Sequence, residues 1–163
     1  MKIKPAVEKA INEQINAELY SAYLYLSMAA YFESINLKGF AHWMQVQAKE
    51  EAGHGMKLYG FVFERGGKVT LKAIEQPKTE WKSALNAFED VYAHELKVTE
   101  LINKLVEAAR AENDVASENF FMWFIDEQVE EEAHALEAVQ KLKMIGDHAQ
   151  QIYMLDREMG KRE

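Results

Sequence analysis

Four glutamates stand where the surrounding pattern calls for apolar residues: Glu18, Glu51, Glu95 and Glu131. His54 follows Glu51 by three residues and Gln128 precedes Glu131 by three, and residues three apart on a helix project side by side. Carboxylates gathered in a dry interior repel one another, and a compact multivalent cation is the natural counter-charge. Oxygen-rich ligation with one imidazole suits iron or manganese.

Helical periodicity predicts the elements that position these side chains. The chain has only 2 prolines and is rich in Ala, Glu, Lys and Leu, which favours helix. Pro5 suits a first helical turn, Ser83 and Asp114 are candidate N-caps, and Gly66 and Gly146 are natural stops. The predicted helices cover about residues 5–35, 40–65, 83–112 and 114–145, with a short amphipathic helix over about 148–159.

The segment between the second and third predicted helices is long enough to run the length of a bundle. A long connection lets the next helix start at the far end. Four long helices with this crossover predict an all-α, four-helix bundle of the ferritin-like type with a short fifth helix. Its length of 163 residues fits one domain over residues 1–163, the bundle occupying about 5–145.

The heights of the four glutamates agree. They lie roughly 11 to 17 residues from the start of their helices, or about 16 to 25 Å along the axis. On the first helix, the predicted apolar stripe includes Ile11, Leu26 and Phe32, and Glu18 lies on the buried face with Ile11, Tyr25 and Phe32. Antiparallel packing therefore places all four carboxylates in one central layer. A lone glutamate on a helix usually faces solvent, and a lone inward histidine is more often a hydrogen-bonded core residue than a ligand. Acids at matching height on four helices nevertheless favour a metal site over a bundle without an active site.

Charge, cysteine content and the length of the apolar runs exclude several classes of function and location. A net charge of −8 argues against nucleic acid as the main partner, since backbone binding needs a basic surface. With 0 cysteines, thiolate catalysis, iron–sulfur clusters and zinc–thiolate sites are excluded. The sequence shows neither a signal-peptide pattern nor an apolar run long enough for a bilayer. We expect a cytoplasmic protein with no membrane partner.

Motifs along nearly the whole chain resemble the bacterial and archaeal non-haem ferritins. They are "NAELYSAYLYLSMAAYF", "LKGFAHWM", "EE..H.MK", "ERGG", "HE..VT", "WF.DEQVEEE" and "LDRE". The resemblance implies a di-iron centre: one iron at Glu18, Glu51 and His54, and the second at Glu51, Glu95 and Glu131 with Gln128 nearby. Tyr25 and Trp123 match aromatic residues beside the centre, for which core packing and a redox role are equally open.

The resemblance also implies a third, weaker iron site at Glu50, Glu127, Glu130 and Glu131. Without the resemblance, the acidic residues around Glu131 are equally explained as a charged helix face exposed to solvent. Glu131 and His134 form a literal Glu-x-x-His, a pattern of di-iron bundles. We prefer the pair of Gln128 and Glu131 because it keeps Glu131 level with Glu95, and His134 remains a possible added ligand.

The function implied by the resemblance is iron storage with ferroxidase activity. Fe(II) and dioxygen would be the substrates, and a homo-oligomeric shell of 24 subunits would hold the ferric mineral. No haem is expected, because Ala52 stands where bacterioferritins place a haem-ligating methionine. A di-iron oxidase or hydroxylase, and a metal-binding bundle without a storage role, remain alternatives. Asp114 and Glu118 are candidates for an acidic iron entry, or else an ordinary helix cap and a solvated first turn.

Overall fold

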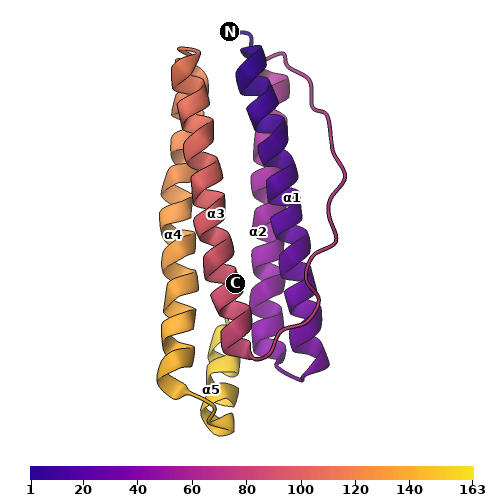
Figure 1. Cartoon of the computed structure of the whole chain (residues 1–163), viewed down its shortest axis with the longest axis vertical. Helices are drawn as coiled ribbons and strands as arrows, with labels where there is room; N and C mark the ends of the chain where they lie inside the picture. The colour runs from indigo at the N-terminus through magenta and orange to yellow at the C-terminus, as the bar shows by residue number, and fades with distance from the viewer.

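The computed structural model describes residues 1–163 and consists of helices and loops without a strand (Figure 1). The helices are α1 (Pro5–Ser34), α2 (Lys38–Glu64), α3 (Ala84–Ala111), α4 (Val115–Ile145) and α5 (Ala149–Met159). The predicted all-α bundle with a short fifth helix is confirmed. None of the helices combines the length and apolar character that crossing a bilayer requires.

The helix ends lie where local chemistry terminates them. Ser83 accepts a hydrogen bond from the backbone N–H of Asn86 at 3.1 Å, and Asp114 accepts one from Ser117 at 3.2 Å. These contacts satisfy amides that have no partner within the helix. Gly146 follows α4 with a φ of 57°, a left-handed conformation that glycine adopts without steric cost. Both predicted N-caps are therefore present.

The chain forms two antiparallel helical hairpins joined by a long crossover. One hairpin is α1 with α2, and the other is α3 with α4 (Figure 1). The crossover, residues 65–83, runs along the bundle beside α1 and delivers the chain to the opposite end, so that α2 and α3 point the same way. Hydrogen bonds from Ser27 to the carbonyl of Lys78 (2.7 Å) and from Asn12 to that of Lys68 (3.0 Å) hold it against α1.

The hydrophobic core is divided into two clusters by a polar layer. One cluster includes Phe32, Phe40 and Phe88, and the other includes Leu58 and Phe121. On each long helix, the glutamate predicted to face inward lies between two core residues that belong to different clusters. In the order α1 to α4, these flanking pairs are Ile15 and Leu24, Ala48 and Leu58, Val91 and Val98, and Phe124 and Ala135. The apolar packing at both ends thus fixes the four acids at one level.

One position of the predicted apolar stripe is wrong. Leu26 is 50% exposed, whereas Leu24, Tyr25 and Met28 are buried. The buried stripe of α1 shifts around the helix along its length, because a hydrophobic repeat closer to 3.5 than 3.6 residues per turn drifts relative to a straight helix. The drift moves Leu26 out of the interface while keeping Glu18 inside it.

Candidate metal centre

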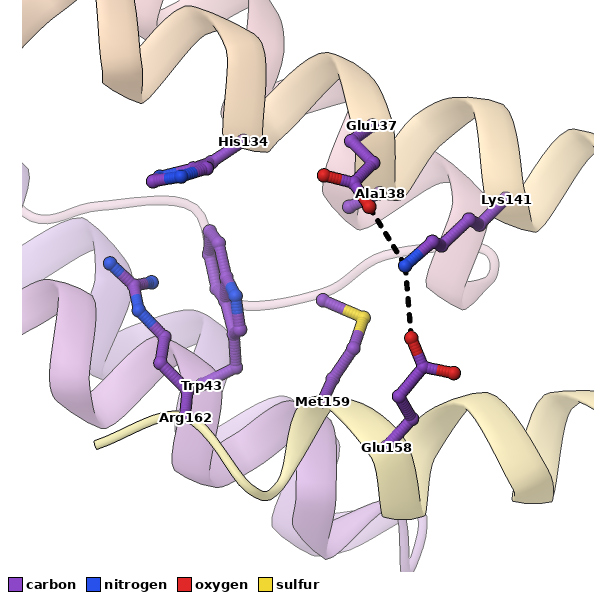
Figure 2. A pocket seen from close by; sticks show the side chains of 8 residues that line it. All are labelled: Trp43, His134, Glu137, Ala138, Lys141, Glu158, Met159 and Arg162. Carbon is purple, nitrogen blue, oxygen red and sulfur yellow. Dashed lines mark hydrogen bonds and ion pairs between the residues drawn. The ribbon is translucent and has the colours of Figure 1, made fainter.

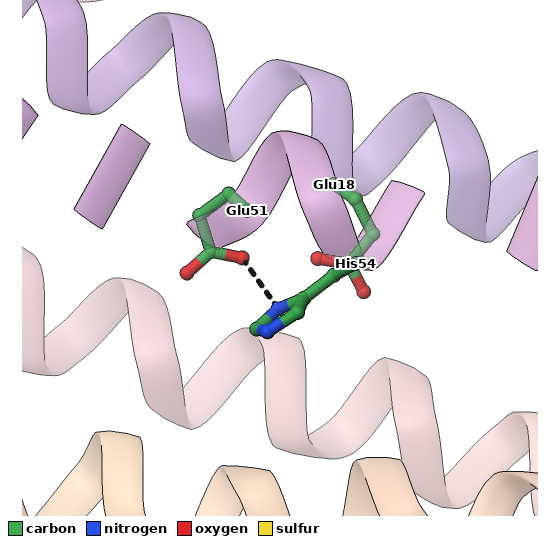
Figure 3. Close-up of side chains that lie close together, drawn as sticks. All are labelled: Glu18, Glu51 and His54. Atoms are coloured by element: carbon green, nitrogen blue, oxygen red, sulfur yellow. Dashed lines mark hydrogen bonds and ion pairs between the residues drawn. The ribbon is translucent and has the colours of Figure 1, made fainter. Parts of the chain in front are cut away.

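The α1–α2 hairpin brings together Glu18, Glu51 and His54. A carboxylate oxygen from each glutamate and a ring nitrogen of the histidine lie within 4.8 Å of one another, and all three residues are buried (Figure 3). Glu51 and His54 project side by side from α2, with 3.2 Å between Glu51 Oε2 and His54 Nδ1. This is a compact set of two carboxylates and one imidazole from two adjacent helices.

Glu51 also belongs to a second buried group, with Glu95 from α3 and Glu131 from α4. One oxygen from each of these three carboxylates again lies within 4.8 Å of the others. The two groups therefore share Glu51, and together they draw ligand atoms from all four long helices. A carboxylate shared by two groups is in the position to bridge two cations.

Amide and hydroxyl donors orient these carboxylates. Each buried glutamate of the two groups accepts a side-chain hydrogen bond: Gln14 to Glu18 at 2.9 Å, Gln47 to Glu51 and to Glu131 at 2.8 Å each, Gln128 to Glu95 at 3.2 Å, and Tyr25 to Glu95. Such outer partners fix ligand geometry in metal sites. Gln128 faces Glu95 through its amide nitrogen, so in this structure it is a hydrogen-bond donor to a ligand candidate.

Glu18 leaves one oxygen unsatisfied. Its Oε2 is buried and has no hydrogen-bond partner, while Oε1 accepts from Gln14. A buried polar atom without a partner costs about 1–3 kcal/mol, and native structures rarely leave one unexplained. Since Oε2 belongs to a residue whose neighbours are Glu51 and His54, a cation held by these three residues would satisfy it.

Burial and mutual repulsion shift the acid–base equilibria of the centre. Desolvation and then the charge of Glu51 raise the pKa of Glu95 to about 8 and that of Glu131 to about 7. The same causes raise the pKa of Glu18 well above its usual value. Burial lowers the pKa of His54, but the hydrogen bond and charge of Glu51, together with the charges of Glu18 and Glu131, outweigh it and raise the pKa to about 9. Without a cation, the centre therefore retains protons near neutral pH.

The residues of the predicted third site are only partly assembled. Glu127 forms a group with His54 and Glu131, with 3.9 Å between His54 Nε2 and Glu127 Oε1. Glu50 is half-buried and forms an ion pair with Arg162, and Glu130 is exposed. Neither belongs to one of the three buried or part-buried groups within metal-binding distance.

His134 does not join the centre. It is exposed and lines a surface pocket of about 320 Å³ beside Trp43, with Glu137, Lys141 and Arg162 on the other walls (Figure 2). The Glu131–His134 spacing therefore does not produce a second ligating histidine. The preference for Gln128 and Glu131 as the inward pair agrees with their burial.

Trp123 lies against the centre through His54. The ring centroids of these two residues are 5.4 Å apart in an edge-on arrangement, and Trp123 is 36% exposed. The ammonium group of Lys57 lies 3.8 Å from the Trp123 ring centroid, a cation–π contact. Trp123 thus connects the buried histidine to the surface.

The two acids suggested for iron entry are both paired with arginines. Asp114 is 5% exposed and its Oδ1 lies 2.9 Å from Arg65 Nη2. Burial raises the pKa of Asp114, but the hydrogen bonds from Arg65 and Ser117 and the charge of Arg65 together outweigh it and lower the pKa overall. Glu118 accepts from Arg110 at 2.7 Å. These contacts favour the capping role of Asp114 over an acidic entry.

Three polar residues that support the centre, Gln14, Gln47 and Arg162, are harder to identify from the sequence than the four glutamates and His54. Gln14 and Gln47 each lie four residues before a glutamate that they contact, and inward glutamine at that spacing is a usable sequence signal. Arg162, which contacts Gln47 and Glu50, has no local signal because its position depends on how α5 folds back.

A family model for the ferritin-like domain matches residues 8–145. The chain belongs to the ferritin family. As a ferritin it is an iron-storage protein, and the predicted resemblance is confirmed.

Curated relatives of this ferritin span nearly its full length. A bacterial non-heme ferritin of Bacteroides fragilis (strain 638R) is 43% identical over 160 residues, which cover 98% of this chain and 99% of the relative. One from Staphylococcus aureus (strain MRSA252) is 39% identical over 154 residues, covering 94% and 93%. An open pore ferritin from the archaeon Archaeoglobus fulgidus superposes with a TM-score of 0.98 at 54% identity, with 100% of each chain covered.

Proposed function

We propose that this ferritin is a ferroxidase whose di-iron centre is built from Glu18, Glu51, His54, Glu95 and Glu131. The observation that carries the proposal is the sharing of Glu51 between two buried three-residue groups. Each group offers a set of ligand atoms for one ferrous ion, and the shared carboxylate holds the two ions together. Gln128 and Tyr25 orient Glu95 from opposite sides of its carboxylate.

The reaction balances with two ferrous ions and one dioxygen. Each Fe(II) loses one electron, and the two electrons with two protons convert dioxygen to hydrogen peroxide. The carboxylates supply negative charge that favours the ferric product over the ferrous substrate. Gln14, Gln47 and Gln128 hold the carboxylates in place, so little reorganisation accompanies the change in iron charge.

The route to storage passes through the less buried side of the centre. Glu127, with Glu50 and Glu130, is proposed to receive a third cation next to Glu131. These residues are more exposed than the central ligands, which suits a site from which ferric product leaves. The similarity to archaeal ferritins supports a homo-oligomer, and we propose a shell of 24 subunits without haem, located in the cytoplasm.

The test adds Fe(II) to the iron-free protein under air and follows ferric absorbance, dioxygen consumption and particle size. The unmodified protein should oxidise Fe(II) rapidly and retain the mineral in a large particle. Glu51→Ala should abolish the fast phase, because it removes the residue common to both groups. Glu64→Ala, an exposed glutamate of the same helix, is the control and should oxidise normally. Equal initial rates in the two variants would refute the assignment.

A further inference from the structure

The segment that follows α5 is anchored to the beginning of α2. Asp156, which is 5% exposed, accepts a hydrogen bond from the backbone N–H of Phe40 at 2.8 Å. A Cβ on Gly39 would lie 1.7 Å from the carbonyl oxygen of Asp156, and one on Gly160 would lie 2.9 Å from the Cα of Gly39. Glycine at both positions therefore permits direct backbone contact and directs residues 160–163, the arm, along α2.

Arg162 of the arm lies along one face of α2. Its guanidinium stacks over Trp43 with 4.5 Å to the ring centroid (Figure 2). Its Nη1 donates to Gln47 Oε1 at 2.8 Å, and its Nη2 donates to Glu50 Oε2 at 2.5 Å. His42 contacts the Arg162 carbonyl oxygen at 2.8 Å. The Arg162 side chain is only 19% exposed, so one arginine fills a fitted position with partners at four α2 residues.

The contact with Gln47 reaches the metal centre. Gln47 is fully buried, and its amide nitrogen donates to Glu51 Oε1 and to Glu131 Oε2 at 2.8 Å each. An arginine can only donate hydrogen bonds, so the carbonyl end of Gln47 must face Arg162. The amide nitrogen is thereby directed at the two carboxylates. Arg162 thus ensures that the amide nitrogen of Gln47, and not its carbonyl oxygen, faces the two carboxylates of the centre.

Whereas the contact with Gln47 supports the two-cation centre, the contact between Arg162 and Glu50 opposes the binding of a third cation. Glu50 is one of the proposed third-site residues, and its Oε2 already binds the guanidinium of Arg162. A cation that uses this oxygen has to displace a charge-assisted hydrogen bond. The planar fork of arginine serves Gln47 and Glu50 together, which the single ammonium group of lysine cannot reproduce.

We propose that Arg162 is a positioning residue that tightens the two-cation centre through Gln47 and holds back the third cation by occupying Glu50. The proposal rests on the proposed ferroxidase function, because it takes the two-cation centre and the third site as given. The arm then controls access to the third site. The third cation binds when Arg162 leaves Glu50, and the departure of Arg162 also frees Gln47 from its fixed orientation.

The test is an anaerobic titration with Co(II), followed by calorimetry and by the visible absorption of the bound cobalt. In Arg162→Ala the first two equivalents should bind about tenfold more weakly, as expected when an outer partner of a ligand is lost. The third equivalent should bind more tightly by about the same factor. Loss of a purely structural contact would weaken all the equivalents together, so opposite shifts are specific to the proposal.

Two further variants complete the experiment. Arg162→Lys keeps the positive charge beside Glu50 but loses the fork, so the third equivalent should stay weak while the first two weaken. Arg157→Ala removes an arginine from the exposed face of α5 and should titrate like the unmodified protein. Circular dichroism and particle size establish that each variant is folded and assembled.

Either of two results would overturn the inference. One is a third equivalent that is unchanged or weaker in Arg162→Ala. The other is identical behaviour of the alanine and lysine variants at the third equivalent. Failure of the underlying two-cation centre looks different, because the unmodified protein would then lack the first two equivalents, whereas failure of the oxidase activity alone would appear only in the Fe(II) assay under air. If Arg162→Ala does not assemble, Gln47→Leu with the arm intact should weaken only the first two equivalents, and an unchanged titration would refute the Gln47 link.

Discussion

Tyr25 on α1 donates its hydroxyl to Oε1 of Glu95 on α3, across the polar layer between the two hairpins. Both residues are buried. Burial, followed by the charge of Glu95, raises the pKa of Tyr25 well above its usual value, so the phenol remains a donor over the working pH range. The hydrogen bond fixes one oxygen of Glu95 and leaves the other to Gln128.

Tyr25→Phe should weaken cation binding at the group of Glu51, Glu95 and Glu131. Removing an outer hydrogen-bond partner of a ligand typically costs 10-fold or more in affinity, so we expect about a tenfold loss for Co(II) or Zn(II). Competition with a coloured chelator measures it. Tyr31→Phe, a buried tyrosine on the same helix that packs against Trp81, is the matched control, and equal affinities in the two variants would show that the Tyr25 hydroxyl does not position Glu95.

The stability of the metal-free protein should fall as the pH rises through neutrality. The pKa of Glu95 is about 8 in the folded protein against an ordinary value of 4.5, and that of His54 is about 9 against 6.5. Between each pair of values the folded protein holds a proton that the unfolded chain has released. Raising the pH within this window therefore favours unfolding.

Thermal denaturation of the metal-free protein at about pH 5.5 and pH 8 tests this. Glu95→Gln should flatten the dependence, because glutamine keeps the shape without the titration. A saturating divalent cation should reverse the trend, since the charged carboxylates then have a counter-charge. A melting temperature that rises with pH in the metal-free protein would contradict the pKa shifts at the centre.

Cation binding should release protons near neutral pH. The raised pKa values of Glu95, Glu131 and His54 mean that the empty centre is partly protonated, while ligands must be deprotonated to bind a metal. Calorimetric Zn(II) titrations in buffers of different ionisation enthalpy at pH 7 should show a buffer-dependent heat. Glu107→Ala, on the exposed face of α3, should leave this heat unchanged, whereas Glu95→Gln should reduce it. Buffer-independent heats would exclude proton release.

Replacing Gly53 or Gly39 of α2 with alanine should change the stability of the subunit in opposite directions. A Cβ on Gly53 would meet nothing within 4 Å, whereas one on Gly39 would lie 1.7 Å from a carbonyl oxygen of α5. Gly53→Ala should stabilise the metal-free subunit by roughly 0.5–1 kcal/mol, the helix-propensity difference. Gly39→Ala should destabilise it and detach α5. Urea unfolding measures both, and a destabilised Gly53→Ala would indicate that another subunit packs against this position.

The sequence pattern predicts the inward placement of the four glutamates well, because a carboxylate stands out on an otherwise apolar stripe. Glu18, Glu51, Glu95 and Glu131 all lie where the periodicity and matching heights place them, and each is buried. The caps at Ser83 and Asp114 follow from local chemistry that needs no tertiary information. Their positions depend on the three or four neighbouring residues alone.

The remaining features depend on contacts between distant segments. The exposure of Leu26 follows from the gradual coiling of the helices, which a straight-helix pattern does not include. Arg162 reaches Gln47 over 115 residues of sequence, through a turn after α5 that no periodicity describes. The sequence marks Asp114 as a candidate cap or entry acid, but only the fold brings Arg65 to it.

The crossover has a consequence for how the centre is divided along the chain. Because residues 65–83 carry the chain between the hairpins, Glu18, Glu51 and His54 are all encoded before it, and Glu95, Gln128 and Glu131 all after it. The first half holds a complete three-residue group by itself, while the residues of the second half form such groups only in combination with Glu51 or His54 of the first half. A chain cleaved within the crossover would then yield two unequal fragments, one able to bind a cation alone and one that acquires its cation only on reassociation.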